Sequence, residues 1–357
     1  MTVRMAQTPL VTMQDVANSL GLSKATISLA LRNHPSIPKT TQARVVKAAK
    51  KLGYRPNPLV SALMSYHLRI KDGGPRLTLA YVTSHPADDP WRSYHAYVRM
   101  FEGAKERATE LGCRLEEFSL ASAGMTPGRL QAILLARGIR GVLAGPLPND
   151  RTVFPLNIEH LVVVGLGMSI VEPAIMRVAC DLYQLARTAV HRSAKLGYRR
   201  IGFAVSVEMS SRLEHRLLAG YRQGLFELGL QESVAPLMPP RTATFSSYLW
   251  AWCQRERPEV IIFGTYDESC QRAVPDDIGC VVICVMSERS PLTGLYSNEN
   301  LVGAIAVEQL LSQLYHNATG PLDEPRTYML RGKWNAGRTA PGPGRKRRPF
   351  VREVRKG

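Results

Sequence analysis

The run VVVGLGMSI (162–170) is the nearest approach to cofactor chemistry in this sequence, because Gly165 and Gly167 directly follow an apolar stretch. Glycines in that position let the backbone approach the phosphates of a dinucleotide. The fingerprint G-x-G-x-x-G needs a third glycine, however, and Ile170 stands in its place. The sequence also lacks GxxxxGK[ST], HExxH and GxSxG. It therefore favours none of the enzyme classes that carry these motifs.

The other reactive side chains are not grouped as a catalytic or metal site requires. The eight histidines are scattered without metal-ligand spacing. The acid pairs Glu116–Glu117 and Asp88–Asp89 are typical of solvated faces. The six cysteines contain no CxxC pair and mostly lie in apolar runs, which predicts buried free thiols in a reducing compartment. We expect no catalytic residue, no metal and no cofactor.

Attraction to a polyanion is the chemistry that the composition favours. The net charge is +17, and it is concentrated at the two ends of the chain. Residues 1–71 carry 11 Lys/Arg and one acid, Asp15, while residues 326–357 carry 11 Lys/Arg and one acid, Glu353. Two strongly basic ends on either side of a middle segment of ordinary charge indicate a nucleic-acid partner. An anionic membrane surface is the alternative, but neither end contains a strong amphipathic anchor with aromatic residues.

The segment TMQDVANSLGLSKATISLAL (12–31) has the spacing of a helix-turn-helix. Thr12 resembles an N-cap with Asp15 in the first turn, and Gly21 ends that helix. Ser23 caps a second helix. The predicted inward-facing residues of the two helices are Val16, Ala17, Leu20, Ile27 and Leu31. A third helix is expected from about residue 39 to residue 53, and its predicted apolar stripe is Val45, Ala48, Ala49 and Leu52.

The outward face of the second helix carries Lys24, Ala25, Ser28 and Leu29. In a helix-turn-helix this face enters the DNA major groove, where lysine can donate to guanine and apolar groups can contact the thymine methyl. A solvated surface with one lysine is the alternative. The nearly acid-free flanks favour DNA, because phosphates lie where lysines and arginines of the third helix can reach.

These two runs, 12–31 and VVKAAKKLGYRPN (45–57), resemble the start of LacI/GalR transcriptional repressors, and the resemblance continues through the entire chain. It implies base-edge contacts by Lys24, Ala25 and Leu29, with Leu29 in place of the usual arginine. The DNA-binding residues that the resemblance implies are Thr12, Ser23, Lys24, Ala25, Thr26, Ser28, Leu29, Asn33, Tyr54, Asn57 and Leu63.

The run RPNPLVSALMSYHLR (55–69) resembles the hinge of that family. Asn57 can cap a short helix, and Pro58 suits its first position. Leu63 matches the leucine that the family wedges into the minor groove at the centre of a palindrome. Val60 departs from the usual alanine. An ordinary helical linker, with Leu63 packed on a neighbour, is the alternative.

Beyond residue 76, short apolar strands alternate with helices. This pattern predicts parallel sheets with helices on both faces, and a ligand crevice at the carboxyl ends of the strands. The strands are expected at 77–83, 114–120, 141–147, 160–167, 200–206 and 260–266, and the helices at 100–112, 129–138, 184–197 and 217–229.

The resemblance implies a two-lobed effector-binding core, similar to periplasmic sugar-binding proteins, with three strands crossing between the lobes. The implied effector-binding residues are Trp91, Asp181, Arg216 and Asp267. Carboxylates there suit sugar hydroxyls, and Trp91 could stack on a ring or pack in the core. The aspartate that the family carries after its penultimate sheet strand is replaced by an apolar run around Cys284.

The expected fold is a small all-α helix-turn-helix domain followed by a two-lobed α/β core with parallel sheets. The expected boundaries are 1–56 for the DNA-binding domain, 57–76 for the hinge helix and linker, 77–340 for the core, and 341–357 for a basic disordered tail. The first lobe is expected at about 77–178 and 292–322, and the second at about 179–291 and 323–340. The tail could add phosphate attraction or only solubility.

We therefore expect a DNA-binding transcriptional regulator, a repressor, that binds a palindromic operator in double-stranded DNA as a homodimer. A small molecule, a sugar or derivative, is expected to switch it. No secretory core and no run near ~20 apolar residues is present, so we expect a bacterial cytoplasmic protein that is nucleoid-associated when bound to DNA. A sugar-binding protein and a ligand-independent architectural DNA binder are the alternatives.

Overall fold

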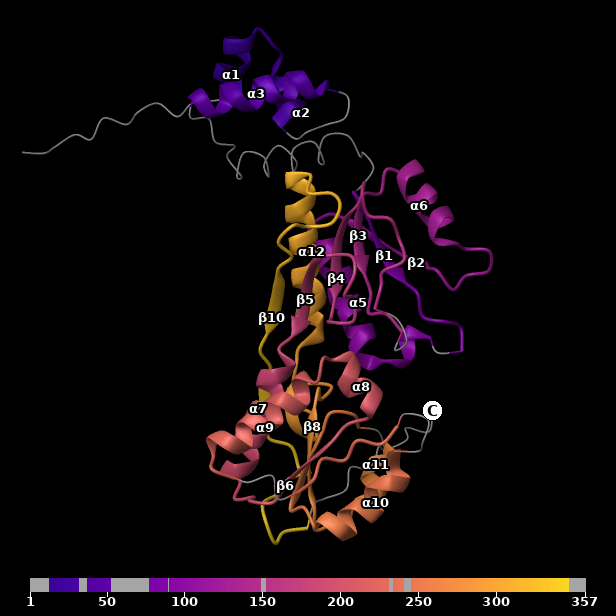
Figure 1. Cartoon of the computed structure of the whole chain (residues 1–357), viewed down its shortest axis with the longest axis vertical. Coiled ribbons are helices and arrows are strands. Elements are labelled where there is room, and N and C mark those ends of the chain that lie inside the picture. The colour runs from indigo at the N-terminus through magenta and orange to yellow at the C-terminus, as the bar shows by residue number, and fades with distance from the viewer. Residues whose placement is uncertain are drawn as a thin grey trace, which may run out of the picture. The chain divides into compact units, whose positions relative to one another are not determined.

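The computed structural model describes residues 13–31, 37–52, 77–88, 90–148, 152–230, 234–240, 245–266 and 268–346. These residues form an N-terminal helical unit and a larger α/β unit, each with a hydrophobic core of its own (Figure 1). Within the described ranges, no helix is long and apolar enough to cross a membrane.

The N-terminal unit consists of three helices: α1 (Met13–Leu20), α2 (Lys24–Leu31) and α3 (Lys39–Leu52). Their fully or nearly buried residues are Val16, Ala17, Ile27, Ala30, Val45 and Ala49. The predicted apolar stripes are thus confirmed, except at Leu52, which is 37% exposed. Leu52 ends the 14-residue helix α3, which is longer than the 8-residue helices α1 and α2 that cover it.

The first lobe of the α/β unit contains a six-stranded sheet. Across the sheet the strands are β10 (Thr327–Leu330), β5 (Met176–Cys180), β4 (Val162–Leu166), β3 (Gly141–Ala144), β1 (Thr78–Thr83) and β2 (Arg114–Ser119). Every pairing in it is parallel. All carboxyl ends therefore lie at one edge of the sheet, where ligands bind in α/β proteins.

Helices cover both faces of this sheet, as its apolar strands require. One face is covered by α6 (Pro127–Ala136), which Thr126 caps through the Arg129 amide. The other carries the short helix η1 (Trp91–Ser93), α5 (His95–Glu110) and α12 (Glu299–His316). Alternation along β1 explains both layers, because Ala80 and Val82 join the α6 core while Tyr81 contacts Phe101 of α5.

The second lobe contains a five-stranded sheet. Its order is β11 (Lys333–Asn335), β9 (Thr293–Tyr296), β8 (Gly279–Ile283), β7 (Val260–Phe263) and β6 (Ile201–Ala204). Its helices are α7 (Leu182–Lys195), α8 (Val207–Arg212), α9 (Arg216–Glu227), α10 (Phe245–Glu256) and α11 (Glu268–Ala273). In Figure 1, α7 and α9 lie on one side of this sheet, and α10 and α11 on the other. Only the β11–β9 pairing is antiparallel among the described pairs.

The chain passes between the lobes after β5, after β9 and after β10. These crossings touch, because the Asp181 amide donates to the Leu330 carbonyl at 2.8 Å and the Cys180 thiol lies 3.6 Å from the Ser297 carbonyl. The predicted lobe boundaries are wrong at two strands. β9 pairs with β8 in the second lobe, and β10 pairs with β5 in the first. Hydrogen bonds to strands that are distant in the sequence determine which sheet β9 and β10 join. No local sequence pattern indicates these partners.

The start of the predicted disordered tail has a defined place on the second lobe. The Gly342 amide donates to the Tyr198 hydroxyl at 2.9 Å, and Pro343 packs beside Gly197. Just before it, Thr339 donates to the Cys280 carbonyl at 2.7 Å. The prediction is therefore wrong for 341–346, because these contacts anchor the segment, and 347–357 lie outside the described residues.

All six cysteines are free thiols, as predicted, and five of them are buried. The exception is Cys284, which follows β8 with a left-handed backbone (φ 69°). Burial of its sulfur raises the pKa of Cys284 to about 12. The thiol is therefore neutral at physiological pH and carries no charge in place of the aspartate that the resemblance implies at this position.

Candidate functional site

The turn between α1 and α2 is built by Gly21 and Ser23. Gly21 has φ 65°, a conformation that costs glycine little, and the Leu22 amide donates back to the Ala17 carbonyl at 3.1 Å. Ser23 caps α2, because its hydroxyl oxygen accepts from the Thr26 amide at 3.0 Å. The predicted cap and turn are confirmed, and together they fix the direction in which α2 leaves α1.

One side of α2 is buried and holds it in the unit. Ile27 and Ala30 are fully buried, and Thr26 and Leu29 are half-buried. Lys24, Ala25 and Ser28 lie on the same helix, but their side chains are outside the described part of the structure. The predicted residues Thr12, Asn33, Tyr54, Asn57 and Leu63 are also outside the described residues.

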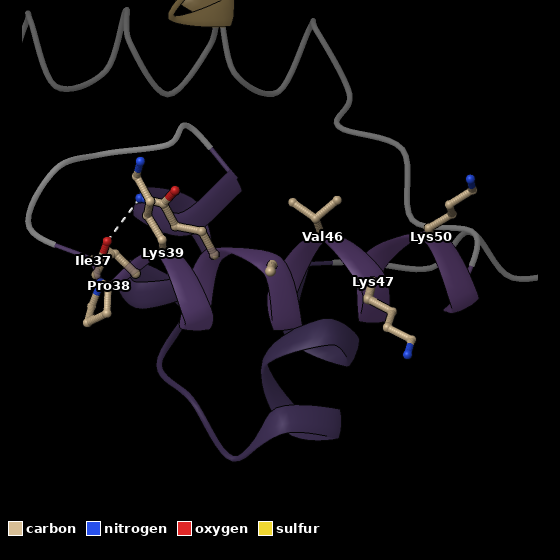
Figure 2. Close-up of a pocket in the computed structure, with 8 residues that line it drawn as sticks. Ile37, Pro38, Lys39, Val46, Lys47 and Lys50 are labelled. Carbon is tan, nitrogen blue, oxygen red and sulfur yellow. Dashed lines mark hydrogen bonds between the residues drawn. The ribbon is translucent and has the colours of Figure 1, made fainter.

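A basic surface follows α3. Lys39, Lys47 and Lys50 line a shallow hollow on this helix together with the exposed Val46. Figure 2 shows Lys47 on the opposite side of α3 from Val46 and Lys50. Gln42 closes the start of the helix by donating to the Ile37 carbonyl at 2.9 Å. Exposed lysines on two sides of a short helix can attract phosphates without reading base sequence.

Of the predicted effector residues, Trp91 lies in the core of the first lobe. It is 5% exposed, and its ring packs against Tyr81 and Phe101 at centroid distances of 5.5 and 5.4 Å. Its indole nitrogen donates to Glu117 at 3.0 Å. The guanidinium of Arg92 binds the same carboxylate and lowers the pKa of Glu117. Trp91 is therefore packed in the core, where its 5% exposure leaves little of the indole to stack on a ligand.

Asp181 and Arg216, two other predicted effector residues, lie at the start of second-lobe helices. Asp181 caps α7, since its Oδ1 accepts from the Gln184 amide at 3.1 Å. Arg216 opens α9 and pairs with Glu214 at 2.5 Å. Asp267 lies outside the described residues. Asp181 and Arg216 are therefore both already bonded within the chain.

The structure brings together another group of side chains where the lobes meet. Arg99 of α5 donates to the Met286 carbonyl and, at 2.9 Å, to the Tyr296 hydroxyl in the second lobe. It also lies 3.5 Å from the buried Glu299 carboxylate. Arg212 of α8 donates in the opposite direction, to the Leu147 carbonyl of the first lobe. Two arginines thus tie the lobes together, and neither is among the site residues predicted from the sequence.

The carboxyl edge of the first sheet also carries an aromatic group. The rings of Tyr94 and Tyr97 stack at 4.9 Å, and the buried His85 lies 5.6 and 5.8 Å from them. Aromatic faces at such an edge suit the apolar face of a sugar or another ring. No group of three or more His, Cys, Asp or Glu side chains that could hold a metal occurs among the residues that the structure describes.

Comparisons with known proteins agree with the helix-turn-helix and the two-lobed core. Residues 12–57 match the family model "Bacterial regulatory proteins, lacI family". The HTH-type transcriptional regulator GntR of Escherichia coli (strain K12) is 24% identical over 336 residues, covering 87% of this chain and 93% of that protein. Catabolite control protein A of Priestia megaterium is 25% identical over 227 residues, 62% of each chain.

Solved structures share the fold. The lac repressor dimer bound to operator and the anti-inducer ONPF has a TM-score of 0.55 and 20% identity, covering 93% of this chain and 99% of that one. At this identity the likeness shows the architecture alone. The family match on the helix-turn-helix and the related regulators along most of the sequence support a DNA-binding transcriptional regulator of the LacI/GalR family.

Proposed function

We propose that this regulator acts as a repressor that binds a palindromic operator in double-stranded DNA as a homodimer. Each protomer places α2 in the major groove of one half-site, and the basic surface of α3 contacts phosphates. The observation that carries the proposal is the Ser23-capped helix α2, held by Ile27 and Ala30 in a unit whose described residues include one acid, Asp15. The lac repressor dimer bound to operator supports this arrangement.

Substitution of Lys24 tests whether α2 reads bases. We expect Lys24→Ala to relax base preference at one half-site position by about 1–3 kcal/mol, because alanine cannot donate to guanine. The measurement is a competition of duplexes that differ at single positions. Lys47→Ala is the matched control, since removing a phosphate-binding lysine from α3 should weaken binding to all duplexes alike. An unchanged base preference in Lys24→Ala would place that side chain in solvent.

The hinge is proposed to bend the centre of the operator. Leu63 is the predicted wedge, although it lies outside the described residues. We expect Leu63→Ala to weaken binding to the selected operator far more than binding to random duplex, because only the specific complex needs the central kink. Titration of both duplexes at one salt concentration measures this. Equal losses on the two duplexes would contradict the wedge.

The effector is proposed to be a carbohydrate or derivative bound where the two lobes meet. Arg216 and Asp267 remain predicted contacts, and Asp181 keeps its second carboxylate oxygen for a ligand hydroxyl. The transcriptional regulator CelR, solved as a complex with cellobiose, supports this class, with a TM-score of 0.53, 19% identity, and coverage of 92% of this chain and 99% of that one. The ligand must have different affinities for the DNA-competent and DNA-incompetent states, since otherwise it shifts nothing.

We propose that the protein has no catalytic activity and that it acts in the bacterial cytoplasm, at the nucleoid when bound to DNA. The alternatives make different predictions. A sugar-binding protein without a DNA function would select no duplex sequence. An architectural DNA binder would bind DNA equally with and without any ligand. A sequence-selective complex whose stability changes with a sugar would exclude both.

A further inference from the structure

The segment that follows β11 runs along the amino edge of the second sheet and is fixed there. The Thr339 hydroxyl donates to the Cys280 carbonyl of β8 at 2.7 Å, and the Thr339 amide donates to the hydroxyl of Thr293, the first residue of β9, at 3.2 Å. The Gly342 amide donates to the hydroxyl of the buried Tyr198, just before β6, at 2.9 Å. These bonds hold the segment across the starts of three strands.

The end of α7 lies against this segment. A methyl group built at Gly197 would lie 3.3 Å from Pro343. Residues 192–200, which end α7 and lead into β6, are therefore neighbours of residues 338–346. Together these two runs form one surface of the second lobe, which we call the amino-edge surface.

The amino-edge surface is strongly basic. Its two runs, 192–200 and 338–346, contain seven Lys/Arg and no acid. The cations exposed on it are Arg192, Lys195, Arg199, Arg338, Arg345 and Lys346. In the sequence the basic run continues beyond the described residues with Arg347 and Arg348. Cations spread over two runs of chain suit a polyanion better than a single small anion.

Acids at the same edge do not cancel this charge. The acids that precede β7 and β8 are Glu256, Glu259, Asp276 and Asp277. Glu256 pairs with Arg255, outside the amino-edge surface, at 2.8 Å. Glu259 is held by backbone, because its Oε2 accepts from the amides of Arg199 and Arg200 at 2.6 and 3.0 Å. The edge therefore keeps an excess of positive charge.

DNA is the polyanion that this surface fits best. A regulator held by α2 on one site is surrounded by further duplex, which raises the effective concentration of that partner. Lysine and arginine bind phosphates along a duplex without reading base sequence. An anionic membrane would be bound better by a surface with exposed aromatic residues, but Tyr198, the one aromatic residue in the two runs, is buried.

We propose that the amino-edge surface is a second DNA-binding surface, which holds the phosphates of another stretch of duplex while α2 reads the operator. A protein with both surfaces bridges two stretches of DNA. The amino edge is the end of the second sheet opposite to the carboxyl edge, where ligands bind in α/β proteins, so bridging does not need an effector. This inference goes beyond the proposed function, because it requires neither a particular operator nor a sugar.

Protection of lysines from acetylation tests the surface on the full-length protein. A duplex of random sequence is added at about 0.05 M salt, where phosphate contacts are strong, and mass spectrometry measures the acetylation rate of each lysine. We expect the duplex to slow acetylation of Lys195 and Lys346 at least threefold. Lys47 of α3 is the positive control for the helix-turn-helix. Lys105, exposed on α5, should react at the same rate with and without duplex.

Charge-removing variants test bridging. Full-length protein is bound to an immobilised duplex, and capture of a second, labelled duplex is measured. The test variant replaces three exposed cations of the surface: Lys195→Gln, Arg345→Gln and Lys346→Gln. The matched control removes equal charge from exposed positions of the first lobe: Arg114→Gln, Arg129→Gln and Arg140→Gln. We expect the test variant to capture at least fivefold less duplex than wild type, and the control to capture as much as wild type.

Unchanged acetylation of Lys195 and Lys346 on addition of duplex would overturn the proposal, and so would equal capture by the two variants. Protection of these lysines by phosphatidylglycerol vesicles but not by duplex would overturn it in favour of a membrane. Failure of the proposed function is seen separately, at Lys47. Protection of Lys195 and Lys346 without protection of Lys47 would support the amino-edge surface and contradict DNA binding by the helix-turn-helix.

Discussion

Ile27→Ala is expected to unfold the N-terminal unit and abolish sequence-selective DNA binding while the α/β unit stays folded. Ile27 is fully buried on α2 in a core of few residues. Truncating a buried isoleucine to alanine costs about 2–5 kcal/mol. A core this small rarely supplies more than about 3–5 kcal/mol, so the loss approaches the whole stability of the unit.

The positions of the tryptophans allow unfolding of the two units to be followed separately in this experiment. All four tryptophans, Trp91, Trp250, Trp252 and Trp334, lie in the α/β unit. Tryptophan fluorescence should therefore show an unchanged unfolding transition in Ile27→Ala, while hydrogen exchange of residues 13–52 loses protection. Leu52→Ala is the control, because Leu52 is 37% exposed and its truncation should change stability by about 0.5 kcal/mol or less. Retained protection and DNA binding in Ile27→Ala would contradict the packing described for α2.

Gly303→Ala is expected to destabilise the α/β unit by about 3 kcal/mol, the upper end for overpacking. A methyl group at Gly303 of α12 would collide with the Met100 carbonyl of α5, and one at Gly103 of α5 would collide with the Asn300 carbonyl. The two helices approach so closely that backbone, not a flexible side chain, meets the added atom. Because α5 carries Tyr97 and Arg99, separation of these helices should also disturb the lobe junction.

Gly128→Ala in α6 is the matched control for that substitution. Nothing lies within 4 Å of a methyl group at Gly128, and alanine is the better helix former. We expect Gly128→Ala to stabilise the protein by about 0.5 kcal/mol. Denaturant unfolding followed by tryptophan fluorescence compares the two variants. Gly303→Ala with wild-type stability would show that α5 and α12 do not pack as closely as described.

The parts of the fold that local patterns determine were predictable from the sequence. The helix-turn-helix follows from an apolar stripe, Gly21 and the Ser23 cap, all within a few residues of one another. The alternating strands and helices of the core follow from short apolar runs between amphipathic segments. Both predictions are confirmed. Local patterns suffice for them because the spacing of apolar residues sets the type of element, whichever segment packs against it.

The lobe junction was not predictable in the same way. Arg99 meets Met286 across 187 residues, and Arg212 meets Leu147 across 65. Which arginine reaches which carbonyl depends on how the crossings place two sheets, and the sequence does not record that. For Trp91 the error is the opposite one, since a residue packed in the core was predicted to contact the effector. Its aromatic side chain suggested a ligand contact, but the strand register beside it, with Tyr81 and Glu117 opposite each other, encloses the indole.

The measurement that tests the central claim most directly is selection of bound duplexes from a random DNA pool. It uses the full-length protein at about 0.15 M salt, where binding to phosphates alone is already weakened. We expect enrichment of a palindrome with a deformable central step, read by two copies of α2. Binding without enrichment, which disappears as salt rises and is unchanged by pooled neutral and anionic sugars, would contradict it, because the basic segments would then only hold phosphates.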